Sequence, residues 1–336
     1  MGDRVNSTPP PRSVDMSAAD VAFLLETLKQ EISVRPATDR VGILGIGPAA
    51  YDVSTWLRSA GMGHRLSGVY EPSATAEQPL DAKPVEALAA DRPQVLVVTS
   101  DRRKEELIEA ALPFIDASIR LLIGGFEHLR YRDPIFLSET ANALVPSFAN
   151  GYPNCLVHLY QVLQNAARHN LDGIVVEFGM FRGGTTMLLS RLAERLGKGW
   201  RVIGFDTFDG FPARRSPLDM YSHPDCVYLD EMEARRFLNG RDVEIIAGDI
   251  VETATQIGDQ PVLLAFIDTD NYSSAIAALN AVQEKIVPGG AIVFDHFTGV
   301  DRFLYTLGER FAAKRLLADR RFFNLHGTGV FVRQAL

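Results

Sequence analysis

Cysteine is scarce in this chain, which limits the chemistry that thiols could provide. The 336 residues include only Cys155 and Cys226. The two have neither the spacing of a metal-binding motif nor that of a redox pair, so a cysteine-based centre is excluded. So few thiols suit a reducing compartment, and we expect a cytoplasmic location.

An excess of basic charge and long apolar runs are also missing. The chain has 42 Asp+Glu against 34 Lys+Arg, so it lacks the charge balance of a general nucleic-acid-binding protein. No stretch reaches the roughly 18 apolar residues that span a bilayer. The polar start from Met1 to Val14 lacks the apolar core of a signal peptide. These absences predict a soluble, unexported protein without nucleic-acid or membrane partners.

The length and the spacing of apolar segments predict two α/β domains. Residues 1–16, polar and rich in proline, are expected to form a disordered tail. A helix capped by Ser17 should open a smaller Rossmann-like domain over residues 17–130, because short apolar segments there alternate with helical ones. The expected strands of this domain are Val41–Ile46, Leu66–Tyr70, Gln94–Thr99 and Arg120–Ile123.

The larger domain is predicted over residues 154–336, after a proline-containing linker at 131–153. A helix, Leu156–Arg168, should precede five parallel strands, and His326-Gly327-Thr328 should turn a final antiparallel hairpin. The expected strands are Ile174–Glu177, Val202–Phe205, Val243–Ala247, Val262–Ile267, Ala291–Phe294, Arg321–Leu325 and Gly329–Val332.

A glycine-rich loop after the first of these strands is the most informative motif. The run from Glu177 to Gly184 contains three glycines, which let a ligand approach the backbone closely, and the next strand ends in Asp206. An acid at that place can chelate a ribose diol. The glycine spacing differs from the usual dinucleotide fingerprint, and this difference indicates S-adenosylmethionine rather than NAD.

Polar side chains also end the later strands, at the edge where ligands of open parallel sheets bind. Asp249 ends the third strand and could accept a hydrogen bond from an adenine amino group. Asp268 ends the fourth strand, and Asp295 with His296 ends the fifth. These three residues are of the types that hold a divalent cation, and such a cation could lower the pKa of a substrate hydroxyl.

These motifs resemble the macrocin O-methyltransferase (TylF-type) family over roughly residues 150–335. The family pattern matches Glu177 to Gly184, Asp206 to Pro212, Gly248-Asp249 with Thr253, and Asp268 to Tyr272. The resemblance implies the seven-stranded Rossmann-like sheet of class I methyltransferases. It also implies S-adenosylmethionine and usually Mg²⁺ as cofactors, and methylation of sugar hydroxyls on natural products and related saccharides. A homo-oligomer is plausible by the same resemblance.

The resemblance also assigns roles to residues. Asp206 is expected at the ribose, Asp249 at the adenine and Asp268 at the metal, where it would take the substrate proton. The predicted cofactor-binding residues are Glu177, Gly179, Phe181, Arg182, Gly183, Thr185, Asp206, Thr207 and Asp249. The predicted metal ligands are Asp268, Asp295 and His296, and the predicted catalytic residues are Asp268 and His296.

His296 departs from the family pattern, which usually ends the fifth strand in two aspartates. A neutral imidazole still binds metals but favours softer ions than Mg²⁺. Alternatively, His296 is the general base of an enzyme that needs no metal, because its ordinary pKa lies near neutral pH. A third reading, a protein that binds S-adenosylmethionine without turnover, also stays open at this point.

Two further segments have an open interpretation. The polar stretch from Ala213 to Arg241 is either a lid that contacts substrate or an ordinary solvated helix with loops. In the first domain, Gly45 to Ala50 and then Glu71 form a weak dinucleotide signal, in which Pro48 removes a backbone N–H. That domain is either a scaffold or docking domain, or the site of an NAD(P)- or sugar-nucleotide-binding enzyme.

Overall fold

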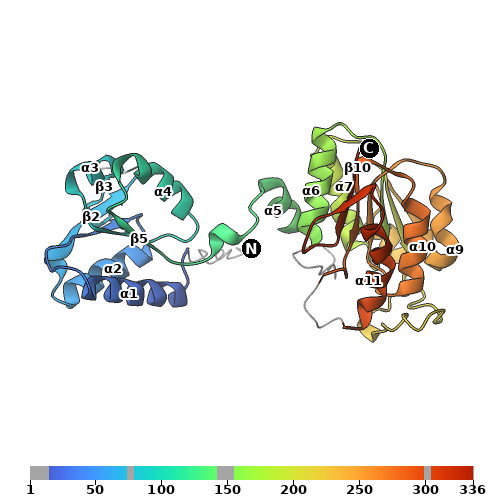
Figure 1. The fold of residues 1–336 in the computed structure, drawn as a ribbon, viewed down its shortest axis with the longest axis horizontal. Coiled ribbons are helices and arrows are strands. Elements are labelled where there is room, and N and C mark those ends of the chain that lie inside the picture. Colours follow the sequence, from blue (N-terminus) through green and yellow to red (C-terminus); the bar gives the residue numbers. More distant parts are fainter. Residues whose placement is uncertain (1–14, 74–78, 142–154, 299–303, 336) are drawn as a thin grey trace, which may run out of the picture. The chain divides into compact units, whose positions relative to one another are not determined.

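The structure is a computed structural model that describes residues 15–73, 79–141, 155–298 and 304–335. The chain divides between Tyr131 and Arg132 into two compact units, each with its own sheet (Figure 1). Nearly all of the predicted tail lies outside the described residues.

The first unit contains a parallel sheet with the strand order β3-β2-β1-β4-β5. Its helix α1 begins where predicted, since the Ser17 hydroxyl accepts a hydrogen bond from the N–H of Asp20 at 3.1 Å. The strands are β1 Val41–Leu44, β2 Leu66–Glu71, β3 Lys83–Pro84, β4 Val95–Val98 and β5 Arg120–Ile123. The helices are α1 Ala18–Ser33, α2 Pro48–Ser59, α3 Leu88–Asp91 and α4 Lys104–Ala111.

Alternating side chains of the two central strands face opposite layers of helices. Ile43 and Val97 pack in one cluster with residues of α1 and α2, whereas Leu44 and Leu96 pack in another with residues of α3 and α4. The sheet is therefore covered on both faces, which explains why β1 and β4 read as unbroken apolar runs. The two-residue β3 was not predicted, because it is too short to show a pattern.

The second unit contains a seven-stranded sheet with the order β11-β12-β10-β9-β6-β7-β8. Strand β12 is antiparallel to both β10 and β11, as the predicted hairpin requires, and the other pairs are parallel. The strands are β6 Ile174–Phe178, β7 Val202–Asp206, β8 Val243–Ala247, β9 Val262–Ile267, β10 Ile286–Phe294, β11 Phe322–Asn324 and β12 Val330–Arg333.

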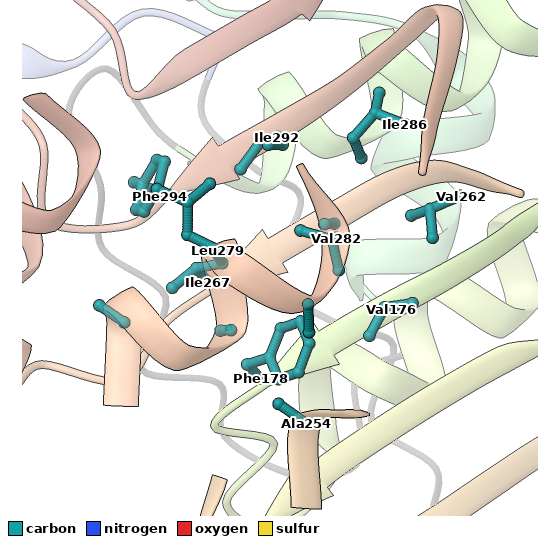
Figure 2. Packing of buried hydrophobic residues seen from close by; sticks show 14 of the residues in the cluster. Val176, Phe178, Ala254, Val262, Ile267, Leu279, Val282, Ile286, Ile292 and Phe294 are labelled. Atoms are coloured by element: carbon teal, nitrogen blue, oxygen red, sulfur yellow. The ribbon is translucent and has the colours of Figure 1, made fainter. Parts of the chain in front are cut away.

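Helices cover both faces of this sheet (Figure 1). Helices α6 and α7 contact the sheet on one face, and α9, α10 and α11 pack together on the other (Figure 1). The core on the second face joins Phe178, Ile267 and Phe294 of three strands to Leu279 and Val282 of α10 (Figure 2). The helices of this unit are α5 Pro134–Ala141, α6 Cys155–Arg168, α7 Gly184–Arg195, α8 Glu231–Phe237, α9 Ile250–Thr253, α10 Tyr272–Val282 and α11 Leu307–Ala313.

Part of the predicted linker is structured. Helix α5 belongs to the second unit, where the Glu139 carboxylate pairs with Arg191 of α7 at 2.5 Å and Asp133 accepts the Tyr160 hydroxyl of α6 at 2.8 Å. Residues 142–154 lie outside the described residues. Strand β10 begins at Ile286 rather than Ala291, because Ile286 already pairs with β9 and the residues up to Ala291, with a φ of +86° at Gly289, form a bulge between two paired parts of the strand.

Candidate active site

A cavity of about 800 Å³ opens among the loops that follow strands β6, β7, β9 and β10. The segment between β7 and β8 supplies another part of its lining, including Phe211, Tyr221 and Tyr228. Because these loops leave the carboxyl ends of parallel strands, the cavity lies where open α/β sheets bind their ligands.

The loop after β6 approaches the loop after β9 so closely that a glycine is required. Gly179 has a φ of +93°, and a Cβ there would lie 1.9 Å from the carbonyl oxygen of Asp268. A larger residue would be strained and would also push the two loops apart. The close contact brings the predicted cofactor loop next to the predicted metal ligand.

Asp206 holds the end of β7 against the glycine-rich loop. Its Oδ2 accepts the N–H of Phe181 at 2.8 Å, and its Oδ1 accepts the N–H of Phe208 at 3.0 Å. Burial raises the pKa of this carboxyl, against the lowering effect of these backbone hydrogen bonds. Gly179, Phe181, Asp206 and Thr207 all line the cavity, and their role in cofactor binding stays a prediction.

Four of the predicted cofactor residues between Glu177 and Thr185 do not contribute to the cavity lining. Glu177 is buried and accepts the hydroxyl of Thr186 on α7, and burial raises its pKa to about 8. The guanidinium of Arg182 stacks on the rings of Phe181 and Tyr228, 5.1 and 5.2 Å from their centroids. Gly183, with a φ of +83°, is the N-cap of α7, and Thr185 is buried in its first turn. A binding role for these four stays a prediction.

Asp249 also lies outside the cavity lining, although its neighbour Ile250 belongs to it. One carboxylate oxygen caps α9 by accepting the N–H of Val251 at 3.0 Å, and the other pairs with Arg215 at 2.5 Å. The predicted contact of Asp249 with adenine is not tested by this geometry.

The loops after β9 and β10 bring two acids and a histidine together. The Nε2 of His296 lies 3.6 Å from Asp268 and 3.1 Å from Asp270. Single ligand atoms of these three side chains all lie within 4.8 Å of one another. Two carboxylates and an imidazole at this spacing fit a divalent cation. The cluster includes Asp270, which the sequence analysis placed in the motif without assigning it as a ligand.

Asp295, the third predicted ligand, is buried beside this cluster. Its Oδ2 lies 3.4 Å from the Nε2 of His296, and its side chain has no exposed surface. Asp295 is not one of the three residues that the geometry groups. Its role as a ligand stays a prediction.

The electrostatics of the cluster reflect the concentration of acids. Burial, followed by the charges of Asp295 and Asp270, raises the pKa of Asp268 well above its ordinary value. Burial lowers the pKa of His296, but the hydrogen bond to Asp270 and the charges of Glu309 and Asp295 outweigh it and raise the pKa to about 9. A cation bound here would compete with the proton on His296.

The stretch from Ala213 to Arg241 contributes residues to the cavity and is anchored to the Asp268–Tyr272 loop. The backbone N–H of Tyr221 donates to Asn271, whose amide donates back to the Tyr221 carbonyl, at 2.9 and 3.0 Å. Asp219 accepts the N–H and the hydroxyl of Ser273 at 2.8 and 2.7 Å. The stretch thus lines part of the cavity. Sequence reasoning missed these anchors because each bond joins residues about fifty positions apart.

In the first unit, the residues of the weak dinucleotide signal are arranged like those around Asp206. Glu71 accepts the N–H of Ile46 at 3.0 Å, as Asp206 accepts that of Phe181. However, the other Glu71 oxygen pairs with Arg103 at 2.6 Å. The acid that would bind a ribose therefore already has a cationic partner.

Comparisons with known proteins agree with the geometry of the second unit. A family model described as macrocin-O-methyltransferase (TylF) matches residues 153–334. No curated protein matches the chain. Within the described residues, no helix is both long and apolar enough to cross a membrane.

Several solved structures are similar in fold. The O-methyltransferase NovP is 21% identical, with a TM-score of 0.46 over 54% of this chain and 79% of that chain. The calicheamicin methyltransferase CalS11 is 19% identical, with a TM-score of 0.40 over 74% of this chain and 89% of that chain. An O-methyltransferase from Bacillus cereus in complex with SAH is 18% identical, with a TM-score of 0.36 over 61% and 91%.

The family match covers more than half of the 336 residues and contains every strand that borders the cavity. The predicted fold, a class I methyltransferase sheet preceded by a smaller Rossmann-like unit, is confirmed. Because the family model matches more than half of its residues, this chain belongs to the macrocin-O-methyltransferase (TylF) family of S-adenosylmethionine-dependent methyltransferases.

Proposed function

We propose that the chain methylates a hydroxyl of a sugar-containing small molecule or natural product, with the help of a divalent cation. The observation that carries this proposal is the placement of Asp206 and the Asp268–Asp270–His296 cluster in the lining of one cavity. A cofactor held at Asp206 would have its methyl group within the same enclosure as the acids.

The composition of the cavity lining supports a small, partly polar acceptor. It combines the rings of Phe211, Tyr221 and Tyr305 with the polar side chains of Ser222 and His223. Pockets for small molecules are typically built this way, from apolar faces with a few polar groups that fix orientation. A sugar ring has both kinds of surface.

The reaction requires two things of this chain's residues, alignment of the acceptor and removal of its proton. In S-adenosylmethionine the sulfonium already activates the methyl group, so the residues chiefly align the acceptor oxygen with it, which can contribute about 7–11 kcal/mol. As the C–O bond forms and the C–S bond breaks, the hydroxyl proton must leave, and we assign its acceptance to Asp268. Its raised pKa makes its carboxylate a stronger base than an exposed one.

The cluster would hold the cation through Asp268, Asp270 and His296, and a bound cation would lower the pKa of the acceptor hydroxyl and orient its oxygen. If the reaction needs no cation, His296 is the alternative general base, since its imidazole faces the same carboxylates. Calorimetric titration with S-adenosylhomocysteine in Mg²⁺ and again in EDTA tests the coupling between cation and cofactor.

The decisive test of the proposed centre is Asp268→Asn. We expect this variant to bind S-adenosylhomocysteine as the wild type does, because the ribose contact is assigned to Asp206 at the end of another strand and asparagine keeps the size of the side chain. Its methyl transfer to a hydroxylated saccharide acceptor should fall by ~10²–10⁴-fold. Full activity in Asp268→Asn would contradict the assignment.

A further inference from the structure

Glu309 is a fully buried carboxylate on helix α11, and its relative exposure is 0%. Its Oε1 accepts the N–H of His296 at 2.9 Å. Its Oε2 accepts the N–H groups of Thr269 and Asp270, both at 3.1 Å. One side chain thus satisfies three backbone donors in the two loops that carry the acid–imidazole cluster.

These hydrogen bonds join loops that belong to different strands. Asp270 lies in the loop after β9, and His296 lies in the loop after β10. The three N–H groups point at one carboxylate, so the backbone of Asp270 is held at a set distance from that of His296. Glu309 itself is not part of the cavity lining, which separates it from groups that touch the acceptor.

The residues beside Glu309 allow α11 to come this close. A Cβ on Gly308 would lie 2.3 Å from the carbonyl oxygen of Leu218 and 2.8 Å from the N–H nitrogen of Tyr272. Arg310 donates to the carbonyl oxygen of Phe297 and stacks 4.6 Å from the centroid of its ring. Helix α11 therefore contacts the loop after β10 at two successive residues.

We propose that Glu309 is a positioning residue that sets the geometry of Asp270 and His296 for cation binding and methyl transfer. The inference rests on the proposed function of the cluster. The carboxylate of Glu309 acts on the two loops through the backbone N–H groups that it bonds, and its negative charge also acts on the His296 imidazole.

The test uses the full chain with Glu309→Gln. An amide keeps the size of the side chain but replaces one acceptor oxygen with an NH₂ group. At one of the two loops this NH₂ group would face a backbone N–H, so the hydrogen bond there would be lost. Glu139→Gln is the matched control, because Glu139 is also a buried carboxylate of the same unit but pairs with Arg191, away from the cluster.

Two measurements are made on each protein. The first is the affinity for Mn²⁺ alone, by calorimetry, which should fall ~10–100-fold in Glu309→Gln and stay unchanged in Glu139→Gln. The second is the ¹⁵N NMR signal of the His296 imidazole at constant pH in EDTA, which should shift in Glu309→Gln only. Binding of S-adenosylhomocysteine in EDTA should stay within about twofold of the wild type in both variants, as expected for a local effect.

The outcomes separate this inference from the proposed function. A wild type that does not bind Mn²⁺ would refute cation assistance, and the imidazole signal would still decide the role of Glu309. An unchanged signal in Glu309→Gln would overturn the inference. So would an equal loss of cofactor binding, which would mean a general structural role. If Glu309→Gln does not fold, Glu309→Asp, which keeps both acceptor oxygens on a shorter side chain, takes its place with the same expected directions.

Discussion

At the scale of single residues, two partly buried acids of the second unit, Asp206 and Asp268, have different partners. Asp206 accepts backbone N–H groups from its own loop and the glycine-rich loop, whereas Asp268 faces other acids and His296. The first arrangement suits an acceptor for a neutral diol. The second suits a proton or a cation, because several carboxylates gather there around one imidazole.

Asp206→Ala should weaken cofactor binding. The change removes the expected ribose acceptor and leaves the N–H of Phe181 without its partner, so the affinity for S-adenosylhomocysteine should fall about 10–100-fold, in line with ~1.5–3 kcal/mol for a hydrogen bond to a charged group. Calorimetry measures this directly. Asp209→Ala, three residues on and exposed, is the control. An unchanged affinity in Asp206→Ala would place the ribose elsewhere.

Glu177 should make the stability of the fold depend on pH. Its pKa is raised to about 8 by burial, so the folded chain keeps a proton that the unfolded chain releases near its ordinary pKa. As pH rises between the two pKa values, the free energy of unfolding should therefore decrease, by about 1.4 kcal/mol per unit of pKa shift at most.

Glu177→Gln should remove this dependence, because an amide does not titrate and can still accept the Thr186 hydroxyl. Urea unfolding at pH 6 and at pH 9 measures the difference. The variant should lose less stability than the wild type over that interval. An identical loss in both proteins would show that Glu177 is ionised in the fold at neutral pH.

At the scale of elements, most strands were predicted within one or two residues, since a buried parallel strand is a short apolar run between polar ends. The structure differs from the prediction where tertiary contacts outweigh a local sequence signal. Pro288-Gly289-Gly290 indicated a turn before the strand, and Gly289 does have a φ of +86°, but Ile286 already pairs with β9, so these residues form a bulge within β10. Helix α5 lies in a proline-containing stretch that predicted a linker, and contacts with α6 and α7 hold it in the second unit.

The segment between β7 and β8 should depend on Asp219 for its position. This carboxylate accepts the N–H groups of Arg215 and Ser216 as well as two bonds from Ser273. Asp219→Ala should cost about 1–3 kcal/mol of stability and raise the KM for the acceptor. Hydrogen exchange over residues 213–228 should increase, while exchange in the first unit stays the same.

Asp225→Ala is the control for this prediction, because the Asp225 side chain lies in the same segment and is 82% exposed. It should leave both exchange and stability near the wild-type values. If Asp219→Ala exchanges no faster than the control, the anchor to Ser273 does not hold the segment.

At the scale of the whole molecule, the sheets of the two units share one feature at their strand ends but differ in the partners of the acid there. In each, an acid at the end of one strand accepts an N–H from the loop after the neighbouring strand. In the first unit the acid also pairs with Arg103, which favours a structural role for Glu71 over a ribose contact.

Glu71→Gln should therefore leave methyl transfer nearly intact. All the contacts of Glu71 described here lie within the first unit, so kcat/KM for the acceptor should stay within about twofold of the wild type, as for independent sites. Steady-state kinetics with a saccharide acceptor measures it. A large loss would show that the first unit takes part in catalysis, and titration with a nucleotide would then be the next step.

The sequence by itself determined the two α/β units, the positions of most strands and the motifs of the cavity, because buried strands, glycine turns and strand-end acids are local patterns. Only the tertiary structure decided that Asp270 joins Asp268 and His296, that Asp249 pairs with Arg215, and that Glu309 holds two loops together. Such contacts join residues far apart along the chain, and only the packing of α11 and the sheet brings them within hydrogen-bonding distance.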